Sequence, residues 1–143
     1  MFCFVLFFFC FCILVLLGHT FFIFVCFPDS GCKYTYDPKP FIFSLVNKPG
    51  WAPVKLSPPG GYQGSSSNSY AIASCPSNGP SFGLGHDLHI ANQAASNTRS
   101  FTNLGNSYGA PSGHTYASTF TRTFLAGSYH FQPDEVEVFY ETN

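Results

Sequence analysis

Charge is scarce in this sequence. Only 9% of its 143 residues are Asp, Glu, Lys or Arg, against roughly 25% in an ordinary soluble protein. The net charge at pH 7 is −1, so the chain has no strongly basic face that could follow a phosphate backbone. These values argue against nucleic acid as a partner.

Residues 1–27 lack charge altogether. They contain no Asp, Glu, Lys, Arg, Asn, Gln or Pro, and only Gly18, His19 and Thr20 interrupt the apolar run. As a helix, this segment would be roughly 40 Å long, enough to cross the roughly 30 Å hydrocarbon core of a bilayer. The composition therefore predicts an apolar helix within residues 1–28, which would anchor the chain in a membrane by a single span.

A second interpretation of residues 1–28 is a gene-model artefact. Phe, Cys, Leu, Val and Ile have thymine-rich codons, so a translated intron with a polypyrimidine tract would have the same composition. Under this interpretation the chain is cytoplasmic. The two alternatives stay open at the level of the sequence, and both place the start of the folded domain at Asp29.

A disulfide pattern is also missing. Four of the six cysteines lie in the apolar run, which leaves Cys32 and Cys75 without a CxxC pair. A single bridge between these two is an open alternative, but a reducing compartment is the simpler interpretation.

Residues 29–143 carry no clear helix pattern and are rich in turn residues. Residues 41–46 form a short apolar run, and the Pro and Gly of Asn47-Lys48-Pro49-Gly50 are typical of a type II turn. Residues 123–131 are also strand-like in composition. Near the C-terminus, residues 135–141 show the period-2 pattern of a strand with one face in water, with Val136, Val138 and Tyr140 on one face and glutamates on the other, where Phe139 interrupts them. We therefore expect an all-β domain with little helix over residues 29–143.

Residues 81–90, Ser-Phe-Gly-Leu-Gly-His-Asp-Leu-His-Ile, hold the densest group of reactive side chains. On a strand, Asp87 and His89 would share one face and His86 would take the other. Such groups could bind a metal or form an acid–base pair, but a zinc site needs three or four ligands. No spacing brings a further ligand to them; the candidates elsewhere in the chain are Cys75, His114 and His130.

A structural role explains these residues better than chemistry does. We expect Asp87 to accept backbone N–H groups near a turn, and Gly83 and Gly85 to allow a close backbone approach. The predicted structural motif consists of Gly83, Gly85, His86, Asp87 and Gly127. The sequence predicts no catalytic, cofactor-binding or metal-binding residue.

Five separate blocks, in this order, resemble the C-terminal part of a TLDc domain. They are residues 41–48, 81–90, 100–105, 124–131 and 135–139. The pattern includes a glycine-rich approach to the His-Asp strand and a Phe-Leu-Ala-Gly-Ser-Tyr segment near the end. Leu84 stands where a third consecutive glycine is more usual, and the apolar run takes the place of the family's upstream half.

The resemblance implies an antiparallel β-sandwich, here incomplete, and a non-enzymatic protein-interaction module without a cofactor. In the family it also implies protection against oxidative stress and, in several animal members, binding to the vacuolar proton-pumping ATPase. No agreed catalytic residues exist to carry over. The alternatives are a small metal-binding or hydrolytic protein that uses His86, Asp87 and His89, or a nonfunctional domain fragment.

Overall fold

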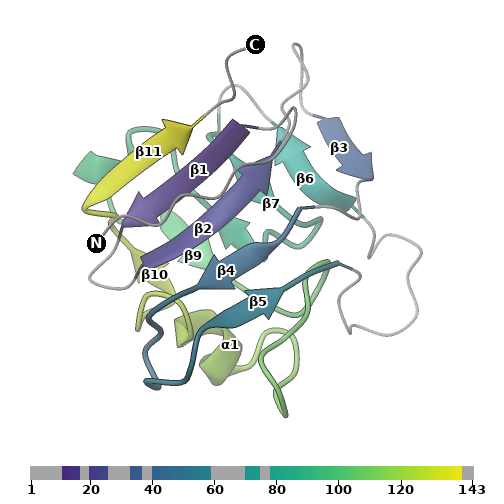
Figure 1. The fold of residues 1–143 in the computed structure, drawn as a ribbon. Coiled ribbons are helices and arrows are strands. Elements are labelled where there is room, and N and C mark those ends of the chain that lie inside the picture. The colour runs from purple at the N-terminus through teal and green to yellow at the C-terminus, as the bar shows by residue number, and fades with distance from the viewer. Residues whose placement is uncertain are drawn as a thin grey trace.

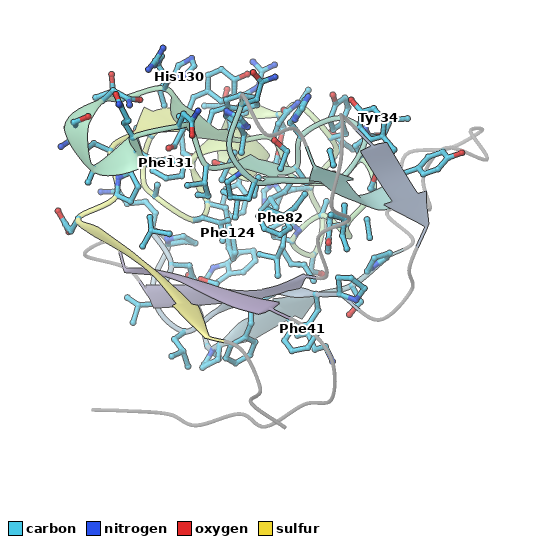
Figure 2. The ribbon with its side chains drawn as sticks, turned by 90° about the horizontal axis from the view of Figure 1, so that it is seen from above. Tyr34, Phe41, Phe82, Phe124, His130 and Phe131 are labelled. Carbon is cyan, nitrogen blue, oxygen red and sulfur yellow. The ribbon has the colours of Figure 1, made fainter. Side chains whose placement is uncertain are left out.

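The computed structural model of the chain describes residues 11–16, 20–25, 33–36, 40–58, 70–74 and 78–139. They form two antiparallel sheets that lie one above the other as two layers (Figures 1 and 2). The first sheet has the strand order β11-β1-β2-β4-β5, with bounds Glu135–Phe139, Phe11–Leu16, Thr20–Val25, Ile42–Ser44 and Val54–Leu56. The second has the order β10-β9-β8-β7-β6-β3, with bounds His130–Phe131, Ser100–Thr102, Leu88–His89, Ser81–Phe82, Tyr70–Ser74 and Lys33–Tyr36. The prediction of a mostly β fold with antiparallel sheets and little helix is confirmed.

The apolar helix expected within residues 1–28 is wrong for the part of that segment that the structure describes. Residues 11–16 and 20–25 are strands β1 and β2, and β1 lies between β2 and β11 in the first sheet. A continuous apolar run fits a buried strand as well as a helix, and its periodicity cannot separate the two. Pairing on both sides supplies the backbone hydrogen bonds that a helix would otherwise make internally. Among the described residues, no helix has the length and apolar character needed to span a membrane.

The core lies between the two sheets. Ile42 of the first sheet and Phe82 and Leu88 of the second are each fully buried, with 0% of their surface exposed. Phe124, from the segment before β10, lies between the layers in Figure 2. The buried side chain of Tyr108 fills the same cluster, and its hydroxyl donates to the carbonyl of Ala71 at 2.9 Å.

One short α-helix interrupts the β structure. Helix α1 spans Thr119–Thr123, and the Ser118 hydroxyl caps it by accepting the N–H of Thr121 at 3.2 Å. Gly127 follows with φ of +79°, and its N–H donates to the carbonyl of Thr123 at 2.8 Å. The strand expected over residues 123–131 is therefore wrong except at its end, where β10 spans His130–Phe131.

The turn after β4 has the positive φ at Gly50, +72°, that the predicted type II turn requires, but its hydrogen bond closes one residue earlier than predicted. The N–H of Gly50 donates to the carbonyl of Asn47 at 2.9 Å, so the turn closes over residues 47–50 and Pro49 is its third residue. A type II turn would place Pro second. The Asn47 side chain also accepts the N–H of Trp51 at 2.8 Å, which favours this earlier closure.

Candidate functional site

The loop between β7 and β8 turns tightly at its two glycines. The N–H of His86 donates to the carbonyl of Gly83 at 3.0 Å, and the φ angles of these residues are +52° and +84°. A side chain at Gly83 would collide with the Asp87 carboxylate, and one at Gly85 would meet the Asn106 amide. The loop therefore depends on glycine for close packing as well as for backbone conformation.

Asp87 is fully buried and holds a neighbouring loop. Its Oδ1 accepts the N–H groups of Gly105 at 2.8 Å and Asn106 at 2.9 Å, and its Oδ2 accepts that of Ser107 at 2.9 Å. Burial raises the pKa of Asp87 to about 6, although the hydrogen bonds from these backbone groups act in the opposite direction. This carboxylate organises residues 105–107 from inside the domain and does not reach the surface.

The expected division of faces in this segment is wrong. His86 and His89 lie together, with ring centroids 5.8 Å apart, while Asp87 points into the interior. The reason is that strand β8 begins only at Leu88. His86 and Asp87 belong to the turn, where the alternation of a strand does not apply.

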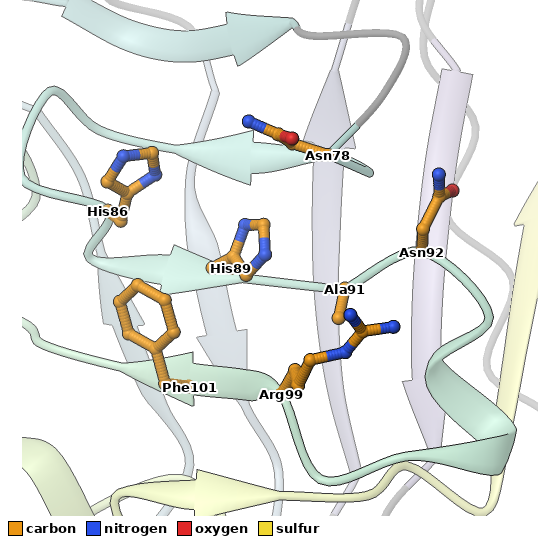
Figure 3. A pocket seen from close by; sticks show the side chains of 7 residues that line it. All are labelled: Asn78, His86, His89, Ala91, Asn92, Arg99 and Phe101. Atoms are coloured by element: carbon orange, nitrogen blue, oxygen red, sulfur yellow. The ribbon is translucent and has the colours of Figure 1, made fainter.

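The two histidines line an open cleft on the second sheet, on the face that points away from the first sheet (Figure 3). Its volume is about 310 Å³, and its lining residues come from β8, β9 and the flanking loops: Asn78, His86, His89, Ala91, Asn92, Arg99 and Phe101. His89 and Phe101 are cross-strand partners with ring centroids 5.1 Å apart. His130, the next partner of Phe101 across the sheet, is exposed on this same face.

The imidazoles of the cleft favour their neutral forms. Burial, and secondly the charge of His86, lower the pKa of His89 to about 4, and burial lowers the pKa of His86. His86 Nδ1 is itself buried without a hydrogen-bond partner among the described residues. Protonating that nitrogen would place an unpaired N–H there, which agrees with the direction of the His86 shift.

Ser81 and His89 form a pair that resembles part of a nucleophile–base arrangement. Ser81 Oγ lies 2.6 Å from His89 Nδ1. However, Ser81 is only 3% exposed, and a pKa of about 4 makes His89 a weak base. Asp87 cannot orient His89, because its carboxylate binds the backbone of residues 105–107. The geometry therefore does not support nucleophilic catalysis at this pair.

The geometry also separates the proposed metal ligands. A site made of His86, Asp87 and His89 would need Asp87 on the side of the two histidines, where it does not lie. In the part of the chain that the structure describes, no three His, Cys, Asp or Glu residues are grouped so that they could hold a metal ion. Two imidazoles alone do not complete a zinc site.

Gly127, the last residue of the predicted motif, is placed elsewhere. It follows α1, and a side chain there would contact Lys48 Cδ at 3.3 Å. The backbone N–H of Lys48 donates to the carbonyl of Phe124 at 3.0 Å, so this glycine lies where the 47–50 turn meets the end of α1. It does not line the cleft.

Sequence reasoning missed several cleft residues, among them Asn78, Arg99 and Phe101. A weak signal was available for Arg99, because only two arginines occur in the chain and this one lies in a polar segment between two strands. Its position in the same cleft as His89 depends on the pairing of β8 with β9, which no local pattern encodes.

Comparison with known proteins identifies the family. The family model of the TLDc domain matches residues 13–141. No curated protein and no solved structure gave a match. The matched region begins at Ile13 and so includes most of β1 and all of β2. The division of the chain at Asp29 stays a prediction. The chain belongs to the TLDc domain family.

Proposed function

We propose that this TLDc domain is a non-enzymatic protein-interaction module. The observation that carries the proposal is the open cleft of about 310 Å³, which lies beside the exposed part of the segment 92–100. Arg99, at the end of that segment, is exposed and lines the cleft. A cleft that is lined by a solvated cation and by Phe101 suits recognition of another protein, because Arg and aromatic side chains are enriched at interfaces.

We further propose that the partner is the vacuolar proton-pumping ATPase and that binding contributes to resistance to oxidative stress. Membership of the TLDc family supports this choice of partner. The unfavourable geometry for catalysis at Ser81 and His89 supports a binding role over an enzymatic one.

An affinity capture experiment tests the proposal. The full chain, tagged at its C-terminus, is expected to recover pump subunits from membranes solubilised in mild detergent. The matched variants are Arg99→Glu at the cleft and Lys55→Glu on β5 of the other sheet, since each changes the charge by the same amount. Recovery should fall for Arg99→Glu and persist for Lys55→Glu. Recovery no greater than that of the tag alone would overturn the proposed partner.

The location of the chain stays a prediction, with membrane and cytoplasm as the two alternatives. Fractionation of cells expressing the untagged chain separates them, because an anchored chain sediments with membranes after an alkaline wash. Transcript sequencing across the codons for residues 27–30 separately tests whether the apolar segment is encoded by the mature message.

A further inference from the structure

The formal charge of the residues that line the cleft is positive. Arg99 is the one lining residue with a formal charge, and no Asp or Glu is among the residues that line the cleft. The buried Asp87 is engaged by the backbone of residues 105–107 on the other side of the loop. Across the described part of the chain, no ion pair is found for the exposed Arg99 guanidinium. The cleft therefore complements an anion.

The planar shape of the Arg99 guanidinium indicates which class of anion the cleft would bind. Its planar fork matches the two oxygens of a carboxylate in a bidentate hydrogen-bond geometry. A cavity of about 310 Å³ is at the lower end of the size range of ligand pockets. It has room for one side chain, and its open form lets the rest of a polypeptide remain outside.

His89 supplies a second hydrogen-bond donor. Ser81 Oγ lies 2.6 Å from Nδ1, and when the hydroxyl donates this bond the ring proton is on Nε2. Nε2 is then the ring nitrogen left to meet a ligand. Figure 3 shows His89 in the middle of the lining, with Phe101 on the neighbouring strand β9 and Arg99 just before that strand.

We propose that the cleft binds the carboxylate of an acidic side chain on the partner protein, with Arg99 as the cation and His89 Nε2–H as a second donor. This inference deepens the proposed function and rests on it, because it names the chemistry by which a protein partner is recognised. The Phe101 ring lies next to the His89 ring, with their centroids 5.1 Å apart.

The test is an NMR titration of the full chain at pH 7 and low salt. The probe is a capped hexapeptide with two adjacent glutamates between Gly-Ser and Ser-Gly, and its match carries two glutamines instead. The readout is the ring Hε1 resonances of His86 and His89. His114, which stacks on Phe120 at 3.5 Å and does not line the cleft, is the internal control.

The glutamate peptide is expected to shift the His86 and His89 resonances and to bind at least about tenfold more tightly than the glutamine peptide. Arg99→Ala should weaken binding about tenfold or more, and Arg99→Lys should be intermediate because it keeps the charge and loses the fork. Lys55→Ala, which removes the same charge from the other sheet, should bind within about twofold of the wild type.

Equal binding of the two peptides, or unchanged binding by Arg99→Ala, would overturn the inference. Sodium acetate tests the other source of carboxylate. If it produced the same shifts at the same carboxylate concentration, the site would be one for small anions and the assignment to a partner side chain would be wrong.

The capture experiment separates this inference from the proposed function. Equal recovery of pump subunits by the wild type and by Arg99→Ala would leave the proposed partner standing and contradict the role of Arg99 and the cleft in binding it. The opposite result is that neither the wild type nor Arg99→Ala recovers pump subunits, while the wild type still binds the glutamate peptide more tightly than the glutamine peptide. That result would support carboxylate binding and overturn the proposed partner.

Discussion

The carboxylate of Asp87 accepts the backbone N–H of Ser107 at 2.9 Å, across 20 positions of sequence. With two further bonds from Gly105 and Asn106, it joins the β7–β8 loop to the segment that follows β9. The Ser107 hydroxyl returns to the first loop and accepts the N–H of Leu84 at 2.9 Å. These hydrogen bonds connect the two loops, so a substitution at Asp87 tests how much the connection contributes to stability.

Replacing Asp87 with Asn should destabilise the domain by about 1–3 kcal/mol at pH 7. The amide nitrogen of Asn cannot accept a hydrogen bond, so at least one of the three N–H groups, two of them buried, loses its partner. Urea unfolding measures the change. Asp134→Asn, at an exposed position, is the control and should stay within about 0.5 kcal/mol of the wild type. Equal effects of the two substitutions would show that the buried carboxylate has no structural role.

The stabilisation from Asp87 should decrease as pH rises. The pKa of Asp87 is about 6 in the fold against a model-compound value of 3.8, so the folded state binds the proton more tightly. The part of its contribution that depends on this proton is fully present below about pH 4 and is lost as pH rises through about 6, by on the order of 3 kcal/mol. The hydrogen bonds that the carboxylate accepts remain as its contribution at pH 7. The measurement is the difference in unfolding free energy between wild type and Asp87→Asn from pH 4 to pH 7. A difference that grew with pH would contradict the direction of the shift.

His86→Gln should raise the pKa of His89. Burial is the larger cause of the lowered value of about 4, and the charge of His86 is the second. Removing that charge leaves the burial in place, so the pKa should rise toward 6.5 without reaching it. An NMR pH titration of His89 Hε1 checks this. An unchanged titration midpoint for His89 would mean that the two imidazole rings have no electrostatic interaction.

The lowered pKa of His89 also affects stability, with the opposite sign to Asp87. A group whose folded pKa is lowered contributes stability above its unfolded value of about 6.5, and the contribution is lost as pH falls through about 4. The unfolding free energy of His89→Gln should therefore depend less on pH below about 6 than that of the wild type. The wild-type curve should be steeper there than that of the variant, as measured by urea unfolding between pH 4 and pH 6.

Gly83→Ala should destabilise the domain more than Gly113→Ala does. Both glycines have positive φ, +84° and +77°, so both substitutions incur backbone strain of about 1 kcal/mol. A side chain at position 83 would also collide with Asp87, whereas nothing lies within 4 Å of one at position 113. We expect an additional loss of about 1–3 kcal/mol at position 83. Equal unfolding midpoints for the two variants would contradict the close packing described for this loop.

The sequence predicted a strand correctly where apolar and polar residues alternate along the chain. Valines and glutamates alternate in β11, and this alternation indicated a strand correctly. The run that contains β1 and β2 is apolar at nearly every position, so it has no period and fits either a helix or a strand. Only its pairing with β11 and β4 distinguishes the two.

The site could be predicted only in part, because its geometry depends on contacts distant in sequence. The glycines and the His-Asp pair marked the loop, but the donors to Asp87 come from residues 105–107. Arg99 and Phe101 reach the cleft through the β8–β9 register. The positive φ of His86, +52°, ends the alternation of a strand at this residue. His86 therefore lies on the side of His89, and Asp87 points into the interior.

The pairing of β1 with β11 has a consequence for synthesis on the ribosome. Leu16 pairs with Glu135, so β1 waits for a strand made roughly 120 residues later, about 6–24 s at usual elongation rates. During that interval the most apolar stretch of the chain has one unfilled edge. Nascent chains should therefore depend on chaperones that shield such edges, and conditions that slow elongation should increase the fraction that aggregates before the first sheet is complete.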